Sequence, residues 1–174
     1  MSMEKGEVGY GQQRDEIAYR QHQDDIEYRR QVVNTYKPDV ERLIRYLPWL
    51  EEKAGHNVAE TFEGSGIKGS SITFPVYDGT LMSFIKELQR TTLLDRNYPY
   101  IYSRHRIRTL QDEFKMIDRA GIKDMDILKG ILSKYALGGM TKARLWSEAV
   151  YNSIFLRVIR KMKENLEYWD KPMV

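Results

Sequence analysis

The sequence predicts a mainly α-helical fold: a compact multi-helix domain with a Gly-rich loop or extended insert and a polar N-terminal helical arm. Apolar residues recur at spacings of three and four along most of the chain, which is the period of an α-helix. The hydrophobic fraction of 41% is typical of a globular domain. The 174 residues include no cysteine, which excludes disulfide frameworks and thiolate metal sites.

Residues 1–36 form the predicted arm, which we expect to be helical or partly disordered. It is rich in Gln, Asp, Glu and Arg. Within it Tyr19, Ile26 and Val33 stand seven apart and form one thin apolar stripe of a helix. So thin a stripe buries little area, and the arm therefore packs on the body or meets a partner chain. Because Pro38 suits a first helical turn and restricts its predecessor, we expect a break at residues 37–39.

Residues 37–174 are expected to form a single α-helical domain, beginning with a short amphipathic helix. Residues 54–71 contain four glycines, which favour a loop. Residues 72–77 are β-prone, but Pro75 disfavours an interior strand. We therefore expect an extended segment that lies across the helices.

Four more helices are predicted in the rest of the domain. They cover residues 78–92, 102–120, 124–139 and 141–172. Each carries apolar residues at helical spacing. Asp78 and Asp124 are expected as N-cap residues, and the glycine pair at residues 138–139 is expected to end the third of these helices.

Charge is nearly balanced overall but unevenly distributed. The chain has 28 Lys and Arg against 25 Asp and Glu, a net charge of +3. Residues 1–36 hold five basic and seven acidic residues, whereas residues 86–123 hold nine and five, and residues 140–174 hold seven and four. A local basic surface attracts phosphate or an acidic partner even when the net charge is small. The alternative is an ordinary solvated helix surface.

The strongest candidate for a functional surface is the segment 98–108, where tyrosines and arginines are interleaved. Its candidate binding residues are Tyr98, Tyr100, Tyr102, Arg104, Arg106 and Arg108. Tyrosine rings offer stacking surfaces and arginines make bidentate contacts to phosphate. We expect Arg104 and Arg108 to share a helix face with Ile101 beneath them. In the alternative, the tyrosines fill gaps between helices and the arginine head groups lie in water.

A second basic set lies towards the C-terminus. Its candidate binding residues are Lys142, Arg144, Arg157, Arg160 and Lys161. Of these, Arg160 and Lys161 stand three and four residues after Arg157, so the three form one stripe of the last helix. The first two lie near the start of that helix, where its dipole disfavours positive charge.

The motifs that would indicate catalysis lack their required context. The run from Gly64 to Gly69 fits G-x-G-x-x-G, but that motif needs a strand before it and a helix after it, and the sequence predicts neither. The three histidines are far apart and have no ligand at helical spacing. Asp124 and Asp126 do not face each other on a helix. We therefore expect no enzyme activity, no cofactor and no metal.

Several segments resemble a bacterial family known only as a domain of unknown function, found in small proteins of anaerobes and their mobile elements. The resembling segments are residues 46–51, 74–78, 84–85, 126–132, 145–149 and 155–163. The clearest is Leu145-Trp146-Ser147-Glu148-Ala149. The family usually has glycine where Arg144 and Ser153 stand here. The resemblance implies a small helical fold and no assigned enzyme activity.

Together these features predict a non-enzymatic binding protein. We expect an accessory factor of a phage or mobile element that binds a nucleic-acid-handling complex or its nucleic acid, for example an anti-CRISPR-type nuclease inhibitor. The alternatives are a structural or self-assembling protein joined through the arm, and a nucleotide-dependent enzyme using the loop at Gly64 with Glu63 or Lys68. The polar N-terminus and the lack of a long apolar run favour a cytoplasmic protein without a membrane partner.

Overall fold

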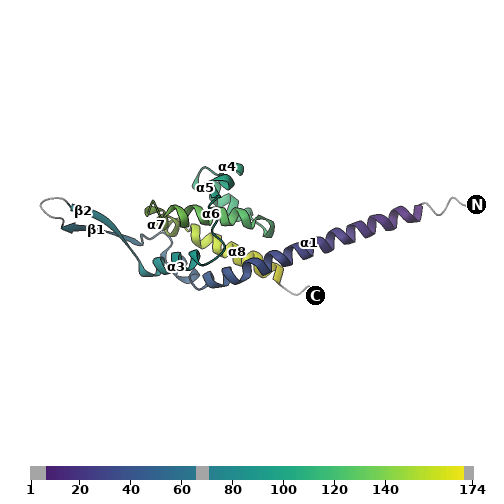
Figure 1. The fold of residues 1–174 in the computed structure, drawn as a ribbon, viewed down its shortest axis with the longest axis horizontal. Helices are drawn as coiled ribbons and strands as arrows, with labels where there is room; N and C mark the ends of the chain where they lie inside the picture. The colour runs from purple at the N-terminus through teal and green to yellow at the C-terminus, as the bar shows by residue number, and fades with distance from the viewer. Residues whose placement is uncertain (1–6, 66–70, 171–174) are drawn as a thin grey trace, which may run out of the picture.

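The computed structural model describes residues 7–65 and 71–170 and confirms a mainly α-helical chain (Figure 1). The elements, in chain order, are α1 (Glu7–Ile44), α2 (Leu47–Lys53), β1 (Ala59–Ser65), β2 (Ser71–Tyr77), α3 (Gly79–Gln89), α4 (Tyr98–Arg104), α5 (Leu110–Arg119), the 3-10 helix η1 (Ile122–Asp124), α6 (Met125–Gly138), α7 (Arg144–Tyr151) and α8 (Ile154–Asp170). The outer half of α1 and the β1–β2 hairpin project from opposite sides of the helical body (Figure 1). Among the described residues, none of the helices combines the length and the apolar character that a bilayer crossing requires.

Helix α1 is a single helix of 38 residues that contains Pro38. The break predicted at residues 37–39 is therefore wrong, and the expected boundary between arm and domain falls inside α1. A proline in a helix interior costs about 3 kcal/mol. Val33 and Val40, on either side of it, are both almost fully buried in the core, and each contributes roughly 1.5–3 kcal/mol by burial. Packing on both sides thus outweighs the cost of the proline.

The hydrophobic core lies where α6, α8, α3 and the inner half of α1 meet. Phe84 of α3 packs edge-on against Phe155 of α8, with ring centroids 5.1 Å apart, and against Tyr46, at 5.3 Å. Helices α1 and α8 run along each other. Near the end of α8, the Arg29 guanidinium of α1 stacks 3.5 Å from the centroid of the Trp169 ring. This contact ties α1 to the C-terminal end of α8.

Residues 59–77 contain an antiparallel hairpin, not a loop followed by a segment across the helices. Strands β1 and β2 pair from Ala59 with Tyr77 to Ser65 with Ser71, and the hairpin extends away from the helices (Figure 1). The glycine motif at residues 64–69 lies mostly outside the described residues. A strand does precede it, contrary to the prediction, but the described residues that follow it form β2 rather than a helix. The context for a phosphate-binding turn is therefore not met.

Pro75 fits this hairpin because of its position in the ladder. Asp78 N–H donates to Val58 O at 3.0 Å, which makes these two residues a hydrogen-bonded pair. Such pairs alternate with non-hydrogen-bonded pairs along an antiparallel ladder. Pro75 faces Thr61 and so occupies a non-hydrogen-bonded position, where the missing N–H is not needed. A two-stranded hairpin has no interior strand, and the sequence rule against proline therefore did not apply.

The helices predicted at residues 102–120 and 141–172 are each divided in two. Arg106, with φ 54°, separates α4 from α5, and Ser153, with φ 61°, separates α7 from α8. Both residues adopt the left-handed region, which ends a right-handed helix. The apolar spacing continues across each turn because the helices on either side face the same core. Periodicity alone therefore did not reveal the breaks.

Two of the three predicted helix ends are confirmed. Thr80 N–H donates to the Asp78 carboxylate at 2.7 Å, which confirms Asp78 as an N-cap, and Gly139 is the C-cap of α6. The Asp124 carboxylate instead accepts Gly121 N–H at 2.9 Å. It therefore closes η1 and does not cap α6 with its side chain.

Candidate functional site

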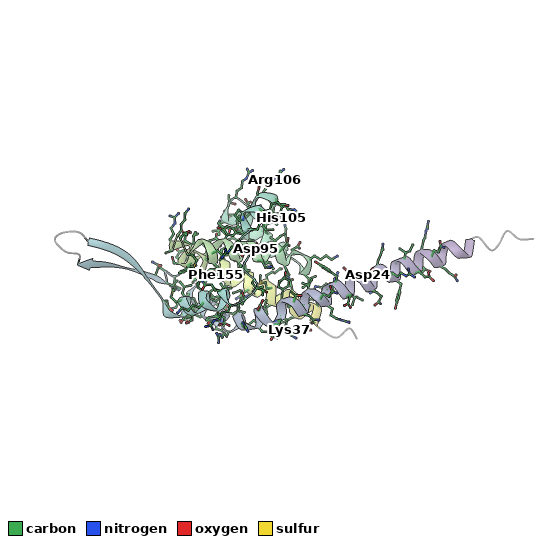
Figure 2. All side chains as sticks on the ribbon, in the orientation of Figure 1. Asp24, Lys37, Asp95, His105, Arg106 and Phe155 are labelled. Atoms are coloured by element: carbon green, nitrogen blue, oxygen red, sulfur yellow. The ribbon has the colours of Figure 1, made fainter. Side chains whose placement is uncertain are left out.

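The first basic feature is the turn between α4 and α5, which we call the arginine turn (Arg104, Arg106 and Arg108). All three side chains are exposed, and within the described part of the chain none forms an ion pair. The structure corrects the expected helix face shared by Arg104 and Arg108, because Arg104 ends α4 and Arg108 follows the left-handed Arg106. Figure 2 shows Arg106 and His105 at the outer edge of the body.

The arginine turn is held in place by the packing of its flanks. Ile101 and Ile107, on either side of it, are buried. A Cβ placed on Gly130 of α6 would lie 2.8 Å from Ile101 Cγ2, so only glycine at this position lets α4 approach α6 so closely. Thr109 and Asp112 form a capping box at the start of α5. The backbone N–H groups of Arg108 and Thr109 lower the pKa of the Asp112 carboxyl. The packed flanks therefore hold the turn in place, and its cationic head groups are exposed to solvent.

The three candidate tyrosines divide between surface and interior. Tyr100 is 54% exposed and Tyr98 is half-buried, so both rings are accessible beside the arginine turn. Tyr102 points inward, and its O–H donates to Glu113 Oε2 at 2.6 Å. The alternative in which tyrosines fill gaps between helices thus describes Tyr102, whereas the binding interpretation stays open for the other two.

Sequence analysis missed Glu113, which is only 3% exposed. Its second oxygen accepts the O–H of Tyr135 at 2.7 Å, and Lys134 Nζ lies 3.6 Å from the first. Burial, together with the adjacent Glu113 charge, raises the pKa of both Tyr102 and Tyr135, so both remain protonated donors. This network ties α4, α5 and α6 together. The available signal was a glutamate on the apolar face of α5, beside Phe114.

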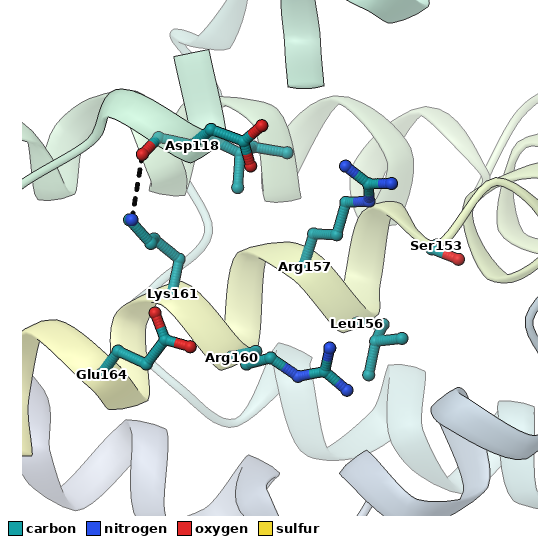
Figure 3. Close-up of a pocket in the computed structure, with 8 residues that line it drawn as sticks. Asp118, Ser153, Leu156, Arg157, Arg160, Lys161 and Glu164 are labelled. Carbon is teal, nitrogen blue, oxygen red and sulfur yellow. Dashed lines mark hydrogen bonds between the residues drawn. The ribbon is translucent and has the colours of Figure 1, made fainter. Parts of the chain in front are cut away.

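The second basic feature is an open pocket of about 410 Å³ beside α8, which we call the α8 pocket. It is lined by Ile117, Asp118, Ser153, Leu156, Arg157, Arg160, Lys161 and Glu164. The predicted stripe of Arg157, Arg160 and Lys161 is therefore brought together in one concave surface. Figure 3 shows these three side chains leaving α8 around the pocket.

The cations of the α8 pocket are only partly engaged by the chain itself. The Arg157 guanidinium stacks 4.0 Å from the centroid of the Phe114 ring. Arg160 lies 3.7 Å from a carboxylate oxygen of Glu51, and Lys161 donates to the main-chain oxygen of Asp118 at 3.0 Å (Figure 3). Among the described residues neither Arg157 nor Lys161 forms an ion pair, although the carboxylates of Asp118 and Glu164 also line the pocket, where three cations face two acids. The pocket can thus accept an anionic group through charge-assisted hydrogen bonds.

The remaining two candidates lie outside both features. Lys142 is exposed in the turn before α7, and Arg144 begins α7, where it lies 3.8 Å from Glu148 one turn later. Neither residue lines the α8 pocket. An exposed pair at this distance contributes little, and the pair therefore leaves Arg144 free to exchange its partner.

Within residues 7–65 and 71–170, no cluster of three or more His, Asp or Glu side chains is arranged to hold a metal ion. Comparisons with protein-family models, curated proteins and solved structures gave no match to the chain. The arginine turn and the α8 pocket are therefore the features whose geometry and charge indicate what the chain binds.

Proposed function

We propose that this chain is a non-enzymatic binding protein, whose basic helical surface holds the phosphate backbone of a nucleic acid or the acidic surface of a nucleic-acid-handling complex. The arginine turn is the main contact in this proposal, with Tyr98 and Tyr100 as stacking surfaces. The α8 pocket is a second contact. The proposed setting is the cytoplasm, where such complexes act.

The observation that carries the proposal is the unpaired state of Arg104, Arg106 and Arg108. These three arginines stand within five residues of one another, all are exposed, and none forms an ion pair in the described structure, so their positive charge is concentrated in one turn. Arg106 also keeps a left-handed conformation, which costs a non-glycine residue roughly 1–2 kcal/mol. Backbone strain that is kept at an exposed arginine such as Arg106 supports a role for this residue in binding.

The concrete form that we propose is steric blocking by a phage or mobile-element accessory factor, such as an inhibitor of a CRISPR nuclease. The resemblance to a family from mobile elements motivates this form. The body offers basic surface, and the arm and hairpin extend its reach on opposite sides (Figure 1). Such a shape covers more of a partner than the helical body does alone.

The test is the salt dependence of binding to a fluorescently labelled oligonucleotide, single-stranded or duplex, followed by anisotropy. Each phosphate contact contributes about 0.7 to 0.9 to the slope of log K against log salt. The variant R104A/R106A/R108A is expected to lower that slope by about 2 to 3. The matched control, R42A/K86A/R90A, removes three exposed cations that likewise lack an ion pair in the described structure. Arg42 lies on α1, Lys86 on α3, and Arg90 is the C-cap of α3.

A much smaller effect of the control triple than of the arginine-turn triple supports the proposal. Equal effects would show that only net charge matters, and binding that ignores salt would contradict the mechanism. Where oligonucleotides do not bind, capture from host lysate with and without nuclease treatment distinguishes an acidic protein surface from nucleic acid. Capture that is independent of the arginine turn in both conditions refutes the proposal.

A further inference from the structure

The outer half of α1 is a helix without support from the rest of the chain. Every side chain from residue 11 to residue 24 is exposed, including Ile17 at 56% and Tyr19 at 65%. The body contacts end at Asp25, whose carboxylate lies 3.1 Å from Lys123 Nζ. Isolated helices of this length are marginal in water, and Gly9 and Gly11 lower helix propensity further. A partner helix would supply the missing support.

The stripe expected as a dimer seam is largely covered by the chain itself. Val33 is buried and Ile26 is half-buried, so only Tyr19 of that stripe is fully open. At 100° per residue, Ile17 and Tyr28 lie on the opposite side of α1 from Ile26. Tyr28 is 47% exposed. The open apolar side of the arm is therefore the one that faces away from the covered stripe.

This open side has the spacing of a coiled-coil seam. Its members are Arg14, Ile17, Gln21, Asp24 and Tyr28. They follow one another at intervals of three, four, three and four, which is the alternation of a heptad seam. Asp24 projects from the arm in Figure 2, clear of the body. Arg14 and Asp24 form no ion pair within the described chain, whereas Asp25 pairs with Arg29 at 3.0 Å.

We propose that two copies of this chain associate through their arms, paired antiparallel along this seam. A two-fold axis level with Tyr19 places Arg14 opposite Asp24 of the second copy and Ile17 opposite Gln21. By symmetry each of these contacts occurs twice, as in any isologous interface. Tyr28 then lies opposite the first turn of the other arm. There is room for its ring at this point, because a Cβ added to Gly9 or Gly11 would contact no other atom of the chain.

Charge selects this orientation over the parallel one. In a parallel pair, Arg14 would face Arg14 and Asp24 would face Asp24, and like charges at facing positions repel. The arm is also close to neutral, since residues 9–24 carry two arginines and three acids. A nearly neutral helix of mixed sign suits a second copy of itself and suits a polyanion poorly. The inference is thus independent of the arginine turn and the α8 pocket, which are the two basic contacts of the proposed function.

The test is sedimentation equilibrium of the full chain over a wide range of concentrations. The wild type is expected to rise from 20.6 kDa towards twice that mass. R14D and D24R each turn two attractive contacts into repulsive ones and are expected to weaken the dimer about tenfold. The charge swap R14D/D24R restores the attraction and is expected to return the dissociation constant to near the wild-type value.

The matched control is D15R, which makes the same charge change as D24R on the opposite side of the helix and is expected to leave the dimer intact. I17D is expected to abolish it. All of these side chains are exposed, so the thermal unfolding of the body reports that each variant folds. A wild type that stays monomeric, a charge swap as weak as its single variants, or D15R as damaging as D24R would each overturn the proposal. Variants of the arginine turn are expected to leave the mass unchanged, which separates this result from the proposed function.

Discussion

Replacing Glu113 by alanine tests whether the buried Glu113 network holds α4, α5 and α6 together. The variant removes the acceptor of two phenol O–H groups, those of Tyr102 and Tyr135, at 2.6 and 2.7 Å. A buried donor left without an acceptor costs about 1–3 kcal/mol. Two such donors predict a loss of about 2–6 kcal/mol in the free energy of unfolding. E113Q keeps one acceptor oxygen and is expected to lose about half as much.

The assay is urea unfolding followed by circular dichroism, in which the transition midpoint and slope give the free energy. The triple variant E113A/Y102F/Y135F removes the orphaned hydroxyls together with their acceptor. It is expected to be more stable than E113A alone, because polar groups removed together leave nothing unsatisfied. A loss below about 1 kcal/mol for E113A, or a triple variant that simply adds the single effects, would refute the reasoning.

The same network predicts a loss of stability at high pH. Both tyrosines have a folded pKa raised above the ordinary value of 10.0, so their contribution is complete below pH 10 and is lost as the pH rises above it. Each tyrosine lowers the free energy of unfolding by up to about 1.4 kcal/mol per pH unit in that range. Y135F is expected to halve the slope of unfolding free energy against pH above pH 10. An unchanged slope would contradict the assignment.

Three further substitutions probe single features by thermal or urea unfolding. S153G relieves the left-handed conformation between α7 and α8 and is expected to stabilise the chain by about 0.5–1 kcal/mol; no gain would mean that the turn is unstrained. G139A places a Cβ 2.0 Å from Trp146 Nε1, whose N–H donates to Ala136 O at 2.9 Å, and is expected to cost about 2–4 kcal/mol; a neutral result would show that the indole moves freely. P38A restores a helical N–H in α1 and is expected to add about 1–3 kcal/mol, whereas a loss would indicate a kink that the fold requires.

The sequence predicts the fold class and most helical segments because burial at a period of 3.6 residues leaves a clear pattern, as around Ile127 and Leu128 in α6. The sequence-based prediction fails where the preference of a residue in an isolated segment is outweighed by tertiary packing. Pro38 breaks isolated helices, yet core contacts on both sides keep α1 continuous. The turns at Arg106 and Ser153 stay hidden because neither residue is a glycine and both flanking helices face one core.

The sequence predicted most of the residues of the candidate site but not the backbone geometry that arranges them. Spacing placed Arg157, Arg160 and Lys161 on one stripe, and the structure brings them into one pocket. The arginine turn was expected on a helix, and its exposure arises from a backbone reversal that no periodic pattern encodes. Glu113 was missed because a charged residue on an apolar face is recognised only when its hydroxyl partners, from two other helices, are known.

Helix α1 passes without interruption from the exposed tip of the arm into the packed centre of the molecule. Once a partner helix supports the outer half, the two ends of α1 keep a fixed distance and a fixed angle. A partner that binds the outer end therefore also sets the orientation of the arginine turn and the α8 pocket. A partner bound at the outer end of α1 thus orients the basic surfaces of the body, because the helix continues through Pro38 without a break.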